Sequence, residues 1–138
     1  MKLSIYIFLL AIVLIACNTT KPIPKGDNET AKISETPSDS TEYELLVFDG
    51  KFDTFLAMQP SKEFYSNEYY RNWNIQYVSE WNARHRNPLK YGNFYETLID
   101  YETNIDYGID LNHQLYNYFL FIEKEYGITL LRRAKTAR

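Results

Sequence analysis

The sequence has little of the chemistry that hydrolases and metal sites use. Its 138 residues include one cysteine, Cys17, and two histidines, His85 and His113. It contains no Gly-x-Ser-x-Gly turn, no His-Glu-x-x-His helix and no glycine-rich phosphate loop. One thiol excludes an intrachain disulfide, and two histidines exclude a histidine-rich zinc site. We therefore expect a chain without cofactor or metal, and not an enzyme of a common class.

Basic residues and long apolar runs are also scarce. The chain has 15 Lys and Arg against 18 Asp and Glu, a net charge of −3, and no basic stripe. This charge pattern excludes a nucleic-acid groove. The apolar run from Leu3 to Ala16 is shorter than the roughly 20 residues of a membrane-spanning helix.

That apolar run has the layout of a signal peptide. A lysine precedes it, and Ala16 is the small residue that precedes cleavage. The sequence Leu14-Ile15-Ala16-Cys17 resembles a bacterial lipobox, whose cysteine is lipidated, with palmitate among the acyl groups. We predict a signal peptide at residues 1–16 and lipidation of Cys17; a plain secretory signal is the alternative.

The residues after Cys17 predict where the anchored protein lies. Asn18 occupies the position where aspartate resembles an inner-membrane retention signal, so the outer membrane is favoured. No acidic run follows directly, which favours the periplasmic side. The predicted partners are the membrane, through the lipid, and an envelope protein or glycan; nucleic acid is not among them.

The chain divides into four parts by composition. After residues 1–16, residues 17–42 are polar and lack aromatic side chains, which predicts a lipidated cysteine followed by a disordered tether. Residues 43–131 hold most of the 13 Tyr, 8 Phe and 2 Trp and predict one compact domain. Residues 132–138 are basic and predict a frayed tail.

Periodicity within residues 43–131 predicts an α+β fold. Strands are expected at residues 43–48, 94–102 and 128–131. A short helix is expected before Pro60, a long one from the Ser66 cap to about Arg86, and a third from the Asp110 cap to Gly127. The order is β-α-α-β-α-β, with about three helices packed on one face of a small three-stranded sheet.

Several blocks of the compact part resemble an uncharacterised family of envelope lipoproteins from Bacteroidota. The blocks are Tyr69-Tyr70-Arg71-Asn72-Trp73-Asn74, Glu80-Trp81-Asn82-Ala83-Arg84, Asn87-Pro88, Tyr107-Gly108-Ile109-Asp110-Leu111-Asn112 and Leu115-Tyr116-Asn117-Tyr118-Phe119. The resemblance implies a one-domain lipoprotein of the cell envelope. It implies no activity and no catalytic residue.

A binding surface is the first functional hypothesis for the long helix. Trp81, Asn82 and Arg84 combine a ring with hydrogen-bond donors and are the candidate ligand-binding residues, for an envelope partner or for a glycan. The alternative is that the aromatic residues, which recur every fourth position, form the buried face of the helix. Arg84 could equally pair with an acidic neighbour.

Acidic residues supply the weaker hypotheses. Asp100, Glu102, Asp106 and Asp110 cluster before the third helix, which fits a calcium site, a glycosidase pair or a solvated surface. Solvation is the favoured interpretation, because the spacing departs from the EF-hand pattern. An unrecognised hydrolase that uses Asp100, Asp106 or His113 remains the third function considered.

Overall fold

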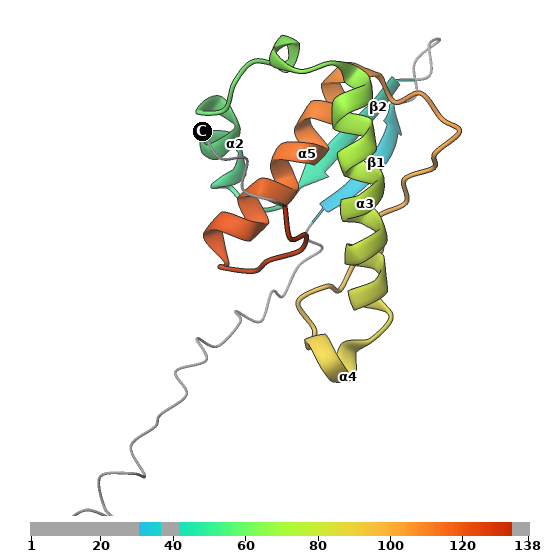
Figure 1. Ribbon diagram of the computed structural model, residues 1–138, viewed down its shortest axis with the longest axis vertical. Helices are drawn as coiled ribbons and strands as arrows, with labels where there is room; N and C mark the ends of the chain where they lie inside the picture. Colours follow the sequence, from blue (N-terminus) through green and yellow to red (C-terminus); the bar gives the residue numbers. More distant parts are fainter. Residues whose placement is uncertain (1–30, 37–41, 134–138) are drawn as a thin grey trace, which may run out of the picture.

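The structure is a computed structural model that describes residues 31–36 and 42–133 (Figure 1). It begins with an antiparallel hairpin of β1 (Ala31–Thr36) and β2 (Glu42–Val47), in which Ile33 lies opposite Leu45. The other elements are α2 (Phe52–Ala57), the 3-10 helix η1 (Lys62–Phe64), α3 (Asn67–His85), α4 (Pro88–Tyr91) and α5 (Gly108–Glu125). The central element is α5, which contacts α3, α2, η1 and β2.

The long helix α3 forms where the sequence predicts it. The Ser66 hydroxyl oxygen accepts a hydrogen bond from the Tyr69 backbone N–H at 3.1 Å, which satisfies one free donor of the first turn. At the other end, the ring of Pro88 disfavours helical geometry at Asn87. The helix accordingly ends at His85, with Arg86 as its C-cap, so the predicted Ser66 cap and the predicted end at about Arg86 are confirmed.

The start of α5 differs from the prediction, while its end agrees. The helix begins at Gly108 and not after Asp110, because the Asp106 carboxylate accepts a hydrogen bond from the Gly108 N–H at 3.1 Å. Gly108 adopts a φ of +75°, which a side chain would disfavour. Gly127 follows the C-cap Tyr126 with a φ of +64°, so the predicted glycine stop is confirmed.

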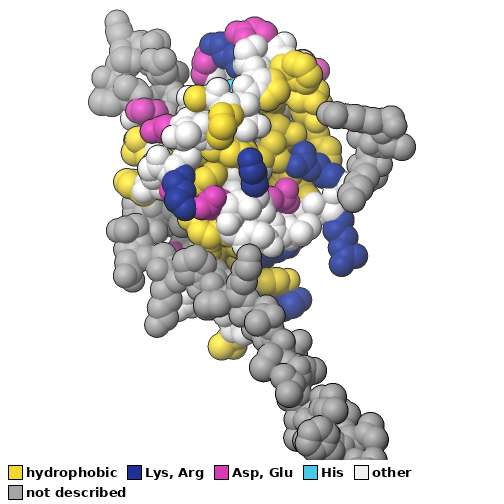
Figure 2. Space-filling model, turned by 90° about the vertical axis from the view of Figure 1, so that its left-hand side faces the viewer, with side chains coloured by type: hydrophobic (Ala, Val, Ile, Leu, Met, Phe, Trp, Pro, Cys, Tyr) yellow, Lys and Arg dark blue, Asp and Glu magenta, His cyan; other side chains and the backbone are white. Residues whose placement is uncertain are grey.

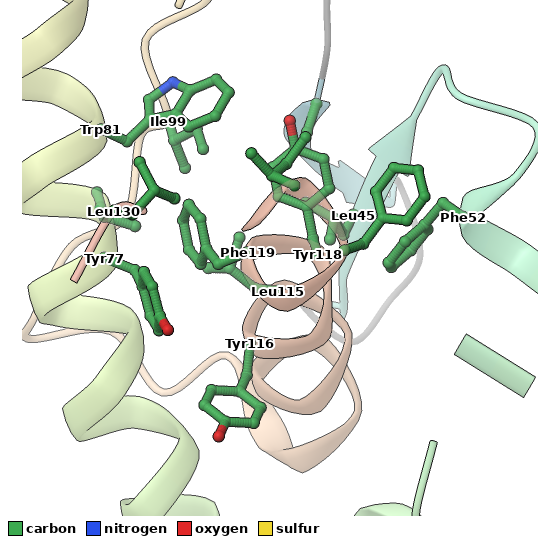
Figure 3. Packing of buried hydrophobic residues seen from close by; sticks show 14 of the residues in the cluster. Leu45, Phe52, Tyr77, Trp81, Ile99, Leu115, Tyr116, Tyr118, Phe119 and Leu130 are labelled. Carbon is green, nitrogen blue, oxygen red and sulfur yellow. The ribbon is translucent and has the colours of Figure 1, made fainter. Parts of the chain in front are cut away.

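An aromatic core fills the space around α5 (Figure 3). Tyr77 of α3 stacks on Phe119 with ring centroids 4.9 Å apart and planes 10° apart. On the other side of α5, Phe52 meets Tyr118 edge to face at 5.9 Å. Pairs of this kind contribute about 0.5–1.5 kcal/mol each beyond the area that they bury. Many of the aromatic residues of the sequence therefore lie in the core.

The strand predicted at residues 94–102 is absent. The segment runs along α3, but its backbone groups bond to side chains of that helix. Trp81 Nε1 donates to the Thr97 carbonyl at 2.8 Å, and Asn82 binds both backbone groups of Ile99. Because side chains satisfy these groups, the segment needs no neighbouring strand.

The strand predicted at residues 128–131 is also absent, for a similar reason. The backbone N–H groups of Leu130 and Leu131 donate to one carboxylate oxygen of Glu123, at 2.9 and 3.1 Å. Leu130 is buried against the core, whereas Thr129 is exposed. A carboxylate at the end of α5 thus replaces the strand partner that the sequence pattern implied.

The fold remains α+β, but the predicted three-stranded sheet and the order β-α-α-β-α-β are wrong. The described residues form a two-stranded sheet and four α-helices, with both strands preceding the helices. The first strand, Ala31–Thr36, lies inside the range 17–42 that was predicted as a tether. Composition misses it because Ile33 and Ala31 are covered only through pairing with residues 43–47.

Three predictions fall wholly or partly outside the described residues. They are the signal peptide at residues 1–16, lipidation at Cys17 and most of the frayed tail at 132–138. Within the tail, Arg133 is described and is held by Tyr116, to whose hydroxyl it donates at 2.9 Å.

Candidate functional site

A cleft of about 200 Å³ opens between the segment that links α2 to η1 and the helices α3 and α5. Figure 2 shows this upper end of the molecule, where hydrophobic, acidic and basic side chains lie together. Drug-sized ligands need roughly 300–1,000 Å³, so the cleft has room for one ring or one side chain of a larger ligand. Its lining includes Pro60, Tyr65, Tyr70, His113, Tyr116 and Asn117.

One face of α5 supplies half of the lining. His113, Tyr116, Asn117 and Leu120 are spaced three and four residues apart, which places them on one side of a helix. The opposite side carries the core residues Leu111, Leu115, Tyr118, Phe119 and Ile122. Because one side is committed to the core, the other is presented to the cleft.

Tyr65, just before α3, and Tyr70, in the first turn of α3, form the aromatic wall. Tyr65 stacks on Tyr69 with centroids 4.0 Å apart and meets Tyr70 edge to face at 5.9 Å. Tyr65 is 39% exposed, whereas Tyr70 is only 2% exposed. Burial raises the pKa of the Tyr70 hydroxyl, so this group stays a neutral donor at physiological pH.

Two polar side chains give the cleft its hydrogen-bonding capacity. His113 Nε2 lies 3.0 Å from the Pro60 carbonyl oxygen, so this nitrogen carries the proton and donates. Asn117 is 3% exposed, and its Nδ2 donates to the His113 carbonyl at 2.8 Å. A buried asparagine in the middle of a helix is costly, because its carboxamide must be satisfied. Its carboxamide oxygen can accept a hydrogen bond from a ligand.

The lining contains no Lys, Arg, Asp or Glu side chain. Gln59 and Leu120 complete it, and neither carries a charge. An ion pair lies nearby on the surface, where Lys62 Nζ contacts an Asp110 carboxylate oxygen at 2.5 Å. The hydrogen bond to Asp110 raises the pKa of Lys62. The cleft itself is therefore neutral and aromatic.

Behind the cleft, Tyr116 joins the lining to the C-terminal segment. Its hydroxyl accepts from Arg133, whose guanidinium also lies over the rings of Trp73 and Tyr77 at 5.5 and 5.7 Å. Arg133 further contacts Glu123 at 3.5 Å. Burial raises the pKa of Tyr77, so that phenol stays protonated beside Glu123. The contact with Arg133 thus ties Tyr116 to the C-terminal segment.

A second hollow, of about 310 Å³, lies beside α2. Phe55, Phe121 and Met58 form its apolar lining. Lys51 and Glu125 at its rim form an ion pair with each other. Thr54 and Lys124 also line this hollow, so its rim carries charged side chains, whereas no Lys, Arg, Asp or Glu side chain lines the cleft.

The predicted ligand-binding residue Trp81 lies in the core. Its side chain is 0% exposed, packs on Tyr95 at 4.9 Å and on Tyr118 at 5.9 Å, and donates to Thr97. In this arrangement its ring has no free face for a ligand. Of the interpretations considered from the sequence, the structure supports the buried face.

Asn82 and Arg84, the other two predicted ligand-binding residues, also make internal contacts. Asn82 binds the backbone of Ile99. Arg84 Nε pairs with Glu80 at 2.7 Å, and its other nitrogens donate to the Tyr95 hydroxyl and the Thr129 carbonyl, each at 2.8 Å. The structure therefore brings Trp81, Asn82 and Arg84 together as ties between α3 and the segments that follow it.

The acidic cluster is divided among separate structural roles. Asp106 bonds to the start of α5, and Asp110 pairs with Lys62. In residues 31–36 and 42–133, no three His, Cys, Asp or Glu side chains are grouped as metal ligands. None of the helices in this part has the length and apolar content needed to cross a membrane. His85 is the last residue of α3, and its Nδ1 lies 2.6 Å from the Tyr95 carbonyl oxygen.

From the sequence, His113 is predicted only as a possible catalytic residue of a hydrolase, and Tyr70 and Asn117 are not predicted as site residues. A usable signal was present. On α5, His113, Tyr116 and Asn117 form a polar and aromatic stripe that faces away from the apolar stripe. What the pattern could not show is that the start of α3 lies against it.

Comparison with known protein families identifies a family for this chain. A family model described as a family of unknown function (DUF6146) matches residues 5–137, which is nearly the whole chain. No curated protein and no solved structure matches the chain.

Proposed function

The chain belongs to DUF6146, a family of unknown function, and from that premise we propose that it is a lipid-anchored binding component of the bacterial cell envelope. Cys17 holds the chain in the outer membrane, with the folded part on the periplasmic side. The folded part binds an envelope component in the aromatic cleft. The anchor and the binding site rest on different observations, so they are tested separately.

The anchor rests on Leu14-Ile15-Ala16-Cys17 and on the resemblance to a lipoprotein family of Bacteroidota. Stable anchoring takes at least two acyl chains, and a lipobox cysteine carries three. Growth with radiolabelled palmitate is expected to label the wild-type chain and leave a Cys17→Ala variant unlabelled. Fractionation of the envelope is expected to place the labelled chain in the outer membrane. An unlabelled wild-type chain would contradict this part of the proposal.

The observation that carries the binding proposal is a neutral cleft that combines aromatic rings with buried polar groups. His113 donates to a backbone carbonyl, and no carboxylate lines the cleft beside it. General acid–base catalysis needs a proton acceptor or donor positioned on the substrate with a tuned pKa, usually with a second group. The arrangement therefore supports recognition of a ligand over its chemical conversion.

A neutral sugar ring of an envelope glycan fits this lining. Tyr65 offers a half-exposed ring on which the apolar face of a sugar can stack. Asn117 offers its carboxamide oxygen to a sugar hydroxyl. The volume of about 200 Å³ admits one unit of a polymer at a time. The cleft, and not Trp81, is therefore the glycan site that we propose, because the Trp81 side chain is fully buried.

Sedimentation with purified peptidoglycan tests the glycan hypothesis. The wild-type chain is expected to co-sediment, and Tyr65→Ala is expected to weaken binding roughly 2- to 10-fold, since one ring contact is lost. Phe48→Ala is the matched control, because Phe48 is 54% exposed and does not line the cleft. Equal sedimentation of all three chains would remove the cleft from the proposal.

An envelope protein is the second candidate ligand, and exposed Phe64 favours it. Phe64 is 62% exposed and packs edge to face on Tyr65 at 4.7 Å, which extends the aromatic surface beyond the cleft. A photo-crosslinking amino acid in place of Phe64 is expected to capture a protein band from whole cells if this candidate is right. Capture of glycan alone would favour the sugar.

A further inference from the structure

The short helix α4 forms one end of the described molecule. In Figure 1 it lies beyond the C-terminal end of α3, away from η1 and from the start of α5. Its residue Leu89 is fully exposed, at 101% of its reference area. Arg86, Pro88 and Lys90 are exposed around it. Single exposed leucines are common on protein surfaces, so a role for Leu89 has to be argued from the residues around it.

The neighbourhood is basic, although the whole chain is acidic. Between Trp81 and Ile99 the chain carries three cationic side chains, Arg84, Arg86 and Lys90, against one carboxylate, Glu96. Arg84 forms an ion pair with Glu80. Within the described part of the chain, neither Arg86 nor Lys90 forms an ion pair.

The contacts of Arg86 and Lys90 leave their charges available to bind an anion. Arg86 Nε donates to the Asn82 carbonyl at 3.2 Å, and Lys90 Nζ lies 4.9 Å from the centre of the Tyr91 ring. Tyr91 is half-buried and amphipathic, a type of side chain that is enriched at the boundary between lipid and water. Figure 2 shows hydrophobic and basic side chains together at this lower end.

We propose that the tip of α4 is a membrane-contact site, at which Leu89 enters an anionic lipid surface while Arg86 and Lys90 bind lipid phosphates. This inference rests on the lipid anchor of the proposed function. An apolar side chain flanked by cations and an aromatic ring matches the layers of a bilayer surface. The contact orients the anchored domain with α4 toward the lipid and the cleft away from it.

The path of the chain agrees with this orientation. The β1 arrow in Figure 1 points away from α4, so the chain enters the hairpin from the α4 side. From Cys17 to Ala31 the chain advances 14 residues, which span at most about 50 Å when fully extended. An anchor at Cys17 therefore keeps this side of the domain close to the membrane.

The contact alone is weak, so it depends on the lipid anchor to hold the domain near the membrane. Burial of one leucine favours binding by roughly 10- to 100-fold, and each cation near an anionic surface adds about fivefold. The product corresponds to a dissociation constant of about 1 mM, which is too weak to recruit a free protein. A short tether supplies an effective concentration in the millimolar range, so the anchored domain spends a large share of its time in contact.

Fluorescence in vesicles tests the contact directly. The lipidated full-length chain is reconstituted into vesicles of phosphatidylethanolamine and phosphatidylglycerol, with Leu89→Cys labelled by a polarity-sensitive dye. Lipidation blocks Cys17, so the introduced thiol is the only one that reacts. We expect a blue-shifted emission and at least twofold quenching by brominated lipid. Phe64→Cys, at the exposed η1 on the opposite end, is the matched control and is expected to report water.

The outcomes separate the contact from the anchor. A dye at position 89 that reports water on floated vesicles overturns the contact, and an equal signal on phosphatidylcholine vesicles overturns the role of the cations. If the chain fails to float, the proposed anchor has failed. A polyhistidine tag bound to nickel-chelating lipid then replaces the anchor, and the same dye decides the contact. Lys90→Glu is expected to reduce the quenching, whereas Arg71→Glu, on the opposite half of α3, is not.

Discussion

The side chain of Asn82 in α3 makes two hydrogen bonds with the backbone of Ile99, as the backbone of a neighbouring strand would. The Asn82 carboxamide donates to the Ile99 carbonyl at 2.8 Å and accepts from the Ile99 N–H at 3.0 Å. One side chain thus satisfies both backbone groups of a buried residue. This pairing explains why the segment after α4 runs beside a helix without forming a sheet.

We expect Asn82→Ala to lower the free energy of unfolding by about 2 kcal/mol, because two hydrogen bonds to Ile99 are lost and its backbone groups stay buried. Chemical denaturation followed by circular dichroism measures the change. Asn72→Ala is the matched control on the exposed side of the same helix and is expected to change stability by less than about 0.5 kcal/mol. Equal effects of the two substitutions would contradict the role assigned to Asn82.

Glu123 is expected to hold the C-terminal segment through Leu130 and Leu131, whose N–H groups donate to it. Glu123→Ala is predicted to lower the free energy of unfolding by about 2–3 kcal/mol, since hydrogen bonds to a charged group are lost. Glu123→Gln keeps an acceptor oxygen and is expected to lose less than half as much. Limited proteolysis provides a second measurement, with faster cleavage after Arg132 or Arg133 in the alanine variant. Identical results for the two variants would show that the acceptor oxygen is unimportant.

Tyr126 links pH to stability at the alkaline end. Burial, followed by its hydrogen bond to Asp49 at 2.7 Å, raises the pKa of Tyr126 to about 12 from an ordinary value near 10. The folded state therefore holds the proton more tightly than the unfolded state does. This contribution to stability is complete below pH 10 and is lost as the pH rises from 10 to 12.

The corresponding experiment compares wild type with Tyr126→Phe. The free energy of unfolding is expected to fall less between pH 9 and pH 12 in the variant, which has no phenol to ionise at this position. Urea denaturation at fixed ionic strength measures both curves. Parallel curves for the two proteins would show that Tyr126 does not carry this dependence.

Trp81→Ala is expected to destabilise the protein by about 3–5 kcal/mol, because it removes a fully buried indole and its bond to Thr97. Trp73→Ala is the matched control, because Trp73 is only partly buried, and it is expected to cost less. Denaturation midpoints compare the two. A Trp81→Ala variant as stable as the wild type would reopen the possibility that this ring belongs to a binding surface.

The helical half of the fold could be predicted from the sequence. Ser66 and Pro88 bracket α3, and Gly127 ends α5, because capping and helix termination depend on residues within a few positions of each other. The two missing strands could not be excluded in the same way. Residues 94–102 and 128–131 have the pattern of strands, but their backbone partners are side chains of Asn82, Trp81 and Glu123, which lie far away or on another element.

The candidate site, too, could be predicted from the sequence only in part. The stripe of His113, Tyr116 and Asn117 on α5 can be read from helical spacing alone. Its position against Tyr65 and Tyr70 cannot, because the start of α3 reaches it only through packing of the two long helices. For Trp81 the sequence left two interpretations, and burial decided between them.

The sequence by itself determined the elements whose causes are local: the cap that starts α3 and the glycine that stops α5. Tertiary structure alone decided which backbone groups pair with which partners, and with them the size of the sheet and the place of the cleft. The physical reason is that a buried N–H or carbonyl group must be satisfied but accepts any partner with suitable geometry. Whether that partner is a strand or the side chain of Asn82 depends on what packing brings within reach of it.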